Sequence, residues 1–250
     1  MLSRHNYFNV LGCNISATNL EDACKAVLSD IKSGTGGYVC FSNVHTVVTS
    51  IKDKKLKQIT NQALMAMPDG KPLSVIGRVR DKLSVAQVAG PDFMPHFFEY
   101  GKGMKHYFYG STPETLQRLV ENFTELYQEA QIVGAYSPPF RELTAAEIES
   151  DLEQIRNSEA DVIWVGLGAP KQEYWMAENW EQLKPAVLLG VGAAFDFHAG
   201  VKSRAPKWMK KYGLEWFYRL SSEPGRLWKR YLVTNTKFVY CLVTEILRRK

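Results

Sequence analysis

The sequence predicts an α/β fold: a Rossmann-like, mostly parallel sheet with helices on both faces, plus a helical, basic C-terminal appendage. Short apolar runs that suit buried strands alternate along the chain with longer stretches of helical apolar spacing. The strand runs are apolar at nearly every position, which is typical of parallel strands covered on both faces. The alternation ends near Gly200, where helical, basic and aromatic sequence begins.

Length and charge divide the chain in two. Its 250 residues suffice for one large domain with an addition, and we expect an α/β body over 1–200 and an appendage over 201–250. The appendage holds 13 of the 31 Lys and Arg residues but only 3 of the 26 Asp and Glu residues, so the rest of the chain is mildly acidic. A basic tail suits an anionic partner such as nucleic acid, acidic lipid headgroups or a pyrophosphate.

Composition argues against several classes of protein. Hydrophobic residues make up 45% and charged residues 23%, as in an ordinary soluble protein. No apolar run approaches the roughly 18–20 residues of a spanning helix, and the N-terminus lacks the apolar core of a secretory signal. The four cysteines are scattered without a CxxC pair, which indicates free thiols in a reducing cytoplasm.

The first elements are predicted from apolar spacing and helix-end signals. A helix over 18–34 begins with a Thr18-x-x-Glu21 capping box and closes at Gly34. We expect strands over 7–15, 38–43 and 63–67, and further helices over 45–62, 72–82 and 92–100.

The pattern continues in the second half of the body. Strands are expected over 105–111, 131–137, 161–168 and 186–197, and helices over 112–130, 144–158 and 170–183. In an open α/β sheet, ligands bind at the carboxyl ends of the strands, so each strand-to-helix junction is a candidate site.

The first two junctions carry polar side chains. In "FSNVHT", Asn43 and His45 either cap the following helix or bind a ligand, and both readings stay open. In "MPDG", Asp69 follows an apolar run, between Pro68 and Gly70. Pro-Asp-Gly is a common turn, yet the place of Asp69 at the end of a strand makes it a candidate reactive carboxylate.

The later junctions are rich in glycine. Gly110 opens "GSTPE", which suits a phosphate or a simple N-cap. In "VGLGAPKQE", Gly168 allows close approach to a ligand and Lys171 adds a positive charge. The motif is not GxGxxG, so a dinucleotide fingerprint is weakly supported. Gln172 and Glu173 either bind sugar hydroxyls or form ordinary helix surface, and Asp196 is a second carboxylate or a structural one.

Metal-dependent and nucleophilic chemistry find little support. The five histidines are dispersed, and no DxD pair presents two carboxylates to a divalent ion that bridges phosphates. Neither a GxSxG elbow nor a local Cys/His arrangement is present. The remaining features suit an anionic substrate handled without a metal or cofactor, with arginines neutralising the leaving phosphate.

The appendage combines cations with aromatic rings. Helical spacing places Trp228, Leu232, Val239 and Ile246 on one side, and Lys and Arg largely elsewhere. This arrangement is typical of an interfacial membrane segment, and equally of a packed helical cap with a solvated basic face. A nucleic-acid partner is disfavoured because no binding motif accompanies the charge.

Several motifs together resemble one family. The segment "RAPKWMKKYGLEWFYRLSSEPGRLWKRY", with "FSNVHT", "MPDGKPL", "GLGAPKQE" and "GVGAAFDFHAG", is similar to the WecG/TagA/CpsF family of inverting glycosyltransferases. The similarity spans nearly the whole chain with the motifs in the family's order. It implies a Rossmann-like, metal-independent enzyme that moves a sugar from a UDP-sugar to a polyprenyl-pyrophosphate-linked saccharide on the cytoplasmic membrane face.

The resemblance also implies residue roles. Asp69 becomes the general base that takes the proton of the acceptor hydroxyl. Appendage arginines are expected to hold pyrophosphate charge while apolar residues touch the membrane. The full set of expected substrate-binding residues is Asn43, His45, Gly70, Gln87, Asp92, Gly110, Gly168, Lys171, Gln172, Glu173, Asp196, Arg204, Arg219, Arg226 and Arg230.

Two positions depart from the family pattern. Gln87 stands where members often carry arginine before the "AGPD" motif, and Phe41 stands where they commonly have threonine. Glutamine donates hydrogen bonds but cannot neutralise a phosphate, so the donor sugar is open between N-acetylmannosamine, glucose and another hexose. A Rossmann-type oxidoreductase and a non-catalytic membrane-bound scaffold are the alternatives, and homo-oligomer formation is possible for the apolar tail.

Overall fold

Six parallel strands form the centre of the structure, a computed structural model that describes residues 6–248 without the side chains at positions 207, 211, 226, 230 and 248. The strand order is β4-β3-β8-β7-β5-β6, and every neighbouring pair is parallel. The predicted α/β fold with a mostly parallel sheet is therefore confirmed. The strands are β3 (Gly37–Ser42), β4 (Met65–Pro68), β5 (Lys105–Gly110), β6 (Gln131–Tyr136), β7 (Val162–Gly166) and β8 (Val187–Gly190).

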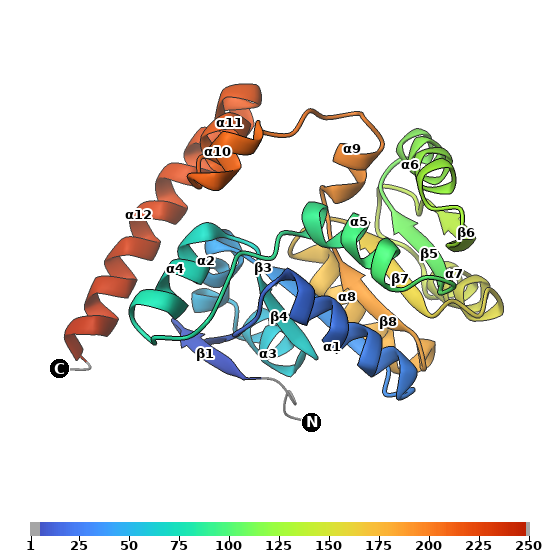
Figure 1. Ribbon diagram of the computed structural model, residues 1–250, viewed down its shortest axis with the longest axis horizontal. Helices are drawn as coiled ribbons and strands as arrows, with labels where there is room; N and C mark the ends of the chain where they lie inside the picture. The colour runs from blue at the N-terminus through green and yellow to red at the C-terminus, as the bar shows by residue number, and fades with distance from the viewer. Residues whose placement is uncertain (1–5, 249–250) are drawn as a thin grey trace.

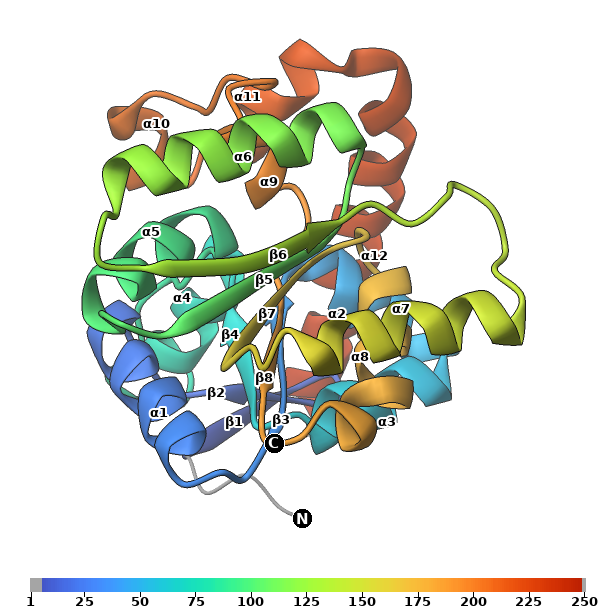
Figure 2. The ribbon, with the colours of Figure 1, turned by 90° about the vertical axis from the view of Figure 1, so that its right-hand side faces the viewer.

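Helices cover both faces of this sheet (Figures 1 and 2). Apolar side chains of alternate strand positions point to opposite faces, so each face has its own core. The first core is closed by α1 (Leu20–Lys32), α5 (Gly90–Tyr100), α6 (Pro113–Leu126) and α9 (Ala194–His198). The second is closed by α3 (Lys54–Gln62), α7 (Ala145–Asn157), α8 (Lys171–Asn179) and the 3-10 turn η1 (Trp180–Leu183).

The N-terminal segment is a hairpin, and the prediction of a single strand over 7–15 is wrong. Strands β1 (Tyr7–Val10) and β2 (Cys13–Ser16) pair antiparallel, with Val10 opposite Cys13. Both turn residues, Leu11 (φ 53°) and Gly12 (φ 90°), have left-handed backbone. That geometry is what a two-residue hairpin turn needs, and Gly12 adopts it without a side-chain clash.

Three predicted boundaries are corrected by local capping and turns. Asn19, not Thr18, caps α1, because its side chain accepts from the Asp22 N–H. The predicted helix over 45–62 is two helices, α2 (Val44–Lys52) and α3, because the Asp53 side chain accepts from the Leu56 N–H and starts a new helix. The last strand ends at Gly190, and the small residues after it turn into α9.

The appendage is helical, as predicted, and lies against the body. It consists of α10 (Lys207–Lys211), α11 (Glu215–Ser222) and α12 (Pro224–Arg248). The long helix α12 crosses α2 and buries Leu227 and Phe238, and Phe238 joins the third core with the hairpin, α2 and α4 (Lys71–Val79). The chain division near Gly200 stays a prediction.

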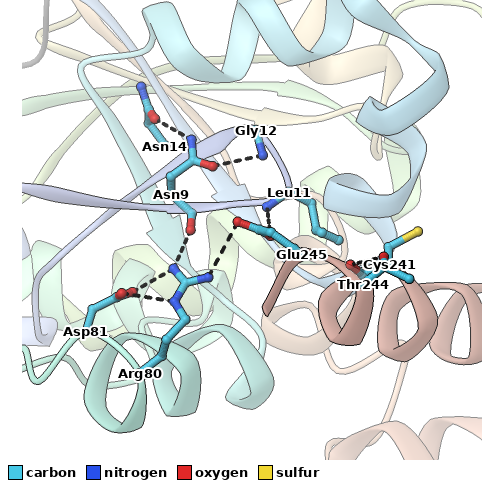
Figure 3. Close-up of polar contacts among 9 residues, drawn as sticks. All are labelled: Asn9, Leu11, Gly12, Asn14, Arg80, Asp81, Cys241, Thr244 and Glu245. Carbon is cyan, nitrogen blue, oxygen red and sulfur yellow. Dashed lines mark hydrogen bonds and ion pairs between the residues drawn. The ribbon is translucent and has the colours of Figure 1, made fainter. Parts of the chain in front are cut away.

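The far end of α12 is attached by polar contacts (Figure 3). Glu245 accepts from the Leu11 N–H at 3.3 Å and lies 3.9 Å from the Arg80 guanidinium. Arg80 is itself fixed by Asp81 and by the carbonyl of Asn9. The appendage is therefore held at the hairpin end as well as near the strand ends described below.

The opposite side of α12 is exposed and apolar. Leu232, Val233, Val239, Tyr240 and Leu247 are each about 60–70% exposed. Within residues 6–248, no helix is both long and apolar enough to cross a membrane. An exposed apolar face on a well-packed helix is typical of a surface that meets another molecule or a lipid boundary.

Candidate active site

Asn43 and Asp69 lie side by side at the carboxyl ends of two neighbouring strands. The parallel register pairs Ser42 of β3 with Pro68 of β4, so the residues that follow each strand meet at the same edge. Asn43 caps α2: its Oδ1 accepts from the N–H groups of His45 at 3.0 Å and Thr46 at 3.3 Å. With its oxygen occupied, the amide turns its Nδ2 to Asp69, 3.5 Å from Oδ2. The capping reading of Asn43 is confirmed, and the same cap aims the amide at the carboxylate.

The backbone of Asp69 is fixed from two sides. Its N–H donates to the Ser42 carbonyl at 2.9 Å, and its own carbonyl accepts from Gln87 Nε2 at 2.6 Å. Gly70, the next residue, packs against Asn43: a Cβ on Gly70 would lie 3.4 Å from the Asn43 Cβ. Asp69 is a partly exposed side chain on a rigid support, which suits a reacting group.

The surroundings of Asp69 favour its protonated form. The pKa of Asp69 is raised to about 7: burial raises it most and the negative charge of Glu215 adds to this, while the Asn43 hydrogen bond and the charges of Arg219 and Arg204 lower it. A carboxylate is normally ionised and weakly basic above pH 4. One that titrates near neutrality is suited to accept a proton from a substrate hydroxyl.

An ion-pair cluster joins the appendage to the first turn of α5. Arg204 binds Asp92 through two parallel hydrogen bonds of 2.6 and 2.7 Å, and Lys210 approaches the same carboxylate at 3.3 Å. The Arg204 Nε donates to Glu215 Oε1 at 3.2 Å. The bidentate contact between Arg204 and Asp92 is the strong form of an arginine–carboxylate pair. It holds α10 and α11 over the strand ends.

The ends of β5 and β7 form a second candidate binding region. The connection from β5 runs outward to β6, whereas the connection from β7 runs inward to β8, so this is a topological switch point of the sheet. Gly110 pairs with Gly166 so closely that a Cβ on Gly110 would lie 2.7 Å from the Gly166 carbonyl carbon. Gly168 (φ +79°) lies beyond them, and a Cβ there would meet no protein atom within 4 Å.

Comparison with known proteins identifies the chain. The model of the glycosyl transferase WecG/TagA/CpsF family matches residues 8–250. The chain belongs to this family. It is 30% identical over 248 residues to the N-acetylglucosaminyldiphosphoundecaprenol N-acetyl-beta-D-mannosaminyltransferase of Bacillus subtilis (strain 168), covering 97% of this chain and 92% of the relative. The transferase of that name from Bacillus spizizenii (strain ATCC 23059 / NRRL B-14472 / W23) is 25% identical over 199 residues, 79% of this chain and 75% of the relative.

The resemblance identified from the motifs is thus confirmed, and the chain is a glycosyltransferase. Within the family fold, the structure shows where the two unusual residues lie. Phe41 is 5% exposed and points into the first core, with its ring 5.4 Å from that of Phe93. Gln87 donates to the Asp69 carbonyl. The amide at position 87 therefore positions the turn that carries the carboxylate.

Gln172 and Glu173 lie inside the protein, and only 3% and 2% of them is exposed. The Gln172 Oε1 accepts from the Gly168 N–H at 3.1 Å, and Nε2 donates to the Gly190 carbonyl at 2.5 Å and to Glu173 at 3.1 Å. These contacts tie the β7–α8 loop to the end of β8. Burial raises the pKa of Glu173 to about 7. The expectation of an ordinary helix surface is wrong for both residues, and direct binding of sugar hydroxyls stays a prediction.

The remaining predicted binding residues lie in different parts of the structure. Asp196 faces Lys202 at 3.0 Å rather than the Asp69 turn, and Lys171 is exposed at the start of α8. Arg219 lies one helical turn after Glu215 on α11 and acts electrostatically on Asp69. Arg226 and Arg230 lie in α12, but their side chains are outside the described part of the structure, so their binding roles stay predictions.

Sequence reasoning missed Glu215 and Lys210. Both belong to the quoted appendage motif, whose basic character predicted binding roles for its arginines alone. The glutamate of "LEW", the first residue of a helix in a strongly cationic segment, was the available signal. Among residues 6–248, no group of three His, Cys, Asp or Glu side chains is close enough to hold a metal ion.

Proposed function

We propose that this glycosyltransferase moves a sugar from a UDP-sugar to a polyprenyl-diphosphate-linked saccharide with inversion at the anomeric carbon, using Asp69 as general base and no metal. The observation that carries the proposal is the environment of Asp69: a carboxylate at the strand ends with a pKa of about 7, fixed by Asn43 and Gln87 and subject to the positive charges of Arg219 and Arg204. Both relatives are named for transfer to a diphosphate-linked lipid acceptor.

The chemistry requires one proton transfer and one displacement. Asp69 accepts the proton of the acceptor hydroxyl while that oxygen attacks the anomeric carbon, and UDP departs from the opposite face of the sugar. A positioned base contributes roughly a hundredfold to ten-thousandfold to such a step. Asn43 orients the carboxylate, because its amide N–H donates to Asp69 while its oxygen is held by the α2 cap.

Leaving-group charge is neutralised by arginine in this proposal. Arg219 on α11 acts electrostatically on Asp69, and the appendage also brings Arg204 and Lys210 to Asp92 at the start of α5. A guanidinium presents paired N–H donors to phosphate oxygens and stays charged at every working pH. The UDP moiety is placed at the β5–β7 switch point, where Gly168 leaves open space and the α6 and α8 N-termini point to the same edge.

The exposed apolar face of α12 supports peripheral attachment to the inner face of the cell membrane. Its large side chains lie on the side away from the body, and Lys229 extends from the same helix. A lipid-linked acceptor keeps its diphosphate at the headgroup level, so an interfacial helix beside the site brings enzyme and acceptor together. N-acetylmannosamine is the donor sugar that the relatives' names favour.

The decisive experiment measures UDP release from a panel of UDP-sugars in the presence of a polyprenyl-diphosphate-linked N-acetylglucosamine acceptor. The expected result is acceptor-dependent release with UDP-N-acetylmannosamine, unaffected by EDTA. The Asp69→Asn variant is expected to bind UDP normally and to lose transfer by at least roughly a hundredfold. Near-normal turnover of Asp69→Asn would remove Asp69 from the mechanism, and EDTA-sensitive activity would contradict metal independence.

A further inference from the structure

Arg219 lies between two acidic residues on one side of α11. Glu215 precedes it by four positions, and Glu223 follows it by four, with its N–H donating to the Arg219 carbonyl at 3.0 Å. Residues four apart are neighbours on a helix surface, so these three side chains share one side of α11. All three are partly buried, whereas Phe217 and Ser221 on the opposite side are exposed. The charged side of α11 therefore faces the protein.

Both acidic side chains are engaged by cations other than Arg219. The Glu215 Oε1 accepts from Arg204 Nε at 3.2 Å, and the Glu223 Oε1 lies 3.3 Å from Lys202 Nζ. A spacing of four is the one at which opposite charges pair on a helix surface. Yet among the described side chains, none forms an ion pair or a hydrogen bond with the Arg219 guanidinium. The two carboxylates best placed to neutralise Arg219 are thus held by Lys202 and Arg204, which we call the linker cations.

The linker cations, which lie in the connection 199–206 between α9 and α10 (Figure 1), are themselves anchored on the body. Lys202 Nζ lies 3.0 Å from Asp196 Oδ2 on α9, and the Lys202 N–H donates to the Asp196 carbonyl at 3.0 Å. Arg204 makes its bidentate contact with Asp92 on α5. Each linker cation thus stands between a carboxylate of the body and a carboxylate of α11, so the body determines where both cations lie.

We propose that Lys202 is a positioning residue: by engaging the Glu223 carboxylate, it keeps the Arg219 guanidinium available for an anionic ligand, the diphosphate of the UDP-sugar. Arg204 does the same with Glu215. A guanidinium whose N–H donors are taken by a carboxylate binds phosphate more weakly, because the two anions compete for the same donors. Lys202 therefore acts on the affinity for UDP as well as on the attachment of α11. This inference rests on the proposed role of Arg219 in neutralising the leaving group.

The test is the dissociation constant of UDP, measured by calorimetric titration at low ionic strength, where ion pairs are least screened. Lys202→Gln releases Glu223 to pair with Arg219. This variant is expected to raise the dissociation constant about twofold to fivefold, the effect of a helical ion pair at a partly exposed site. Lys202→Gln combined with Glu223→Gln removes the competing carboxylate as well and should restore the wild-type constant. Lys202→Arg keeps a cation in place and should bind UDP normally.

The rescue distinguishes this role from simple attachment of the appendage. If Lys202 only tethers α11, the double variant lacks both partners of the tether and should bind UDP as weakly as Lys202→Gln, a result that overturns the inference. A wild-type constant in Lys202→Gln, together with a weakened one in Arg219→Gln, overturns it as well. The matched control is Lys102→Gln, which breaks a lysine–glutamate pair with Glu129 ahead of β5 and β6 and should leave the constant unchanged.

A measurement without ligand separates this inference from the proposed function. The ¹H–¹⁵N signal of the Arg219 Nε–H, assigned by its absence in Arg219→Gln, reports whether a carboxylate binds the guanidinium. The signal should shift in Lys202→Gln and return to its wild-type position in the double variant, whereas an unchanged signal overturns the inference. Wild-type affinity of Arg219→Gln for UDP would overturn only the proposed role of Arg219 at the diphosphate.

Discussion

The amide of Asn43 points its Nδ2 at Asp69 Oδ2, 3.5 Å away, because its Oδ1 is committed to capping α2. One side chain thus performs a structural and a chemical task. The helix cap fixes which end of the amide faces the carboxylate, and a donor there favours the ionised form of Asp69.

Asn43→Ser separates these two tasks. Serine is nearly as good a helix cap as asparagine, so the free energy of unfolding should change by less than about 0.5 kcal/mol. The variant lacks the amide donor, so the pKa of Asp69 should rise and the acidic limb of kcat/KM should move to higher pH. The matched comparison is Asn43→Ala, which lacks the cap as well and should lose about 1 kcal/mol of stability. An unshifted limb in Asn43→Ser would show that the contact does not act on the base.

Asp69→Asn should stabilise the protein while it inactivates the enzyme. Burial raises the pKa of Asp69 from the ordinary value of 3.8 to about 7, so between these values the unfolded chain ionises while the folded protein keeps the proton. Stability of the wild type therefore falls as pH rises through this window, and the variant avoids the loss. At pH 8 the free energy of unfolding of Asp69→Asn should exceed that of the wild type by at most about 4 kcal/mol, and by less because Asp69 is partly exposed.

Urea unfolding of both proteins at pH 4 and pH 8 measures this difference. The advantage of Asp69→Asn should be small at pH 4 and larger at pH 8. An advantage that is the same at both pH values would contradict the raised pKa.

The pair of Arg204 and Asp92 should hold the appendage to the body. Both Arg204→Gln and Asp92→Asn are expected to speed protease cleavage between α9 and α10 and to lower activity, because α11 is no longer fixed over the strand ends. The cleavage rates give the free energy needed to detach the appendage from the body. A double-mutant cycle on this free energy should give a coupling of about 1–2 kcal/mol, since Asp92 remains partly exposed. Strictly additive effects would mean that the two side chains do not act together.

The exposed face of α12 should mediate binding to anionic vesicles. Val239→Glu combined with Val243→Glu places charges on that face and should weaken vesicle binding at least roughly tenfold, with little effect on melting temperature. Phe140→Glu changes a still more exposed apolar residue in the loop between the edge strand β6 and α7, at the opposite edge of the sheet from β4, and should bind vesicles normally. Equal binding by all three proteins would contradict membrane attachment through α12.

Gly168→Ala tests the placement of UDP at the β5–β7 switch point. A Cβ at Gly168 meets no protein atom within 4 Å, so the fold should lose only the roughly 1–2 kcal/mol of a left-handed alanine. If UDP occupies that space, the added methyl group should lower the affinity for UDP at least roughly tenfold. Calorimetric titration with UDP checks the expectation, and wild-type affinity would place the nucleotide elsewhere.

The sequence by itself determined the alternation of strands and helices, because apolar periodicity is a local property of the chain. It also determined the family, through motifs such as "MPDG" and the appendage signature. Hairpin formation at Leu11-Gly12 was missed, since the apolar run continues through a turn that only left-handed backbone reveals. The helix break at Asp53 was missed for a similar reason: one capping carboxylate outweighs continuous helical spacing.

Only the tertiary structure decided which side chains act together. Parallel register brings Asn43 beside Asp69 across 26 positions of sequence, and Arg204 reaches Asp92 across 112. Whether Gln172 lies on a surface or inside the protein depends on how helices pack over strand ends, which periodicity does not encode. The motifs therefore named the residues, and long-range packing assigned each of them its neighbours, its charge environment and so its chemistry.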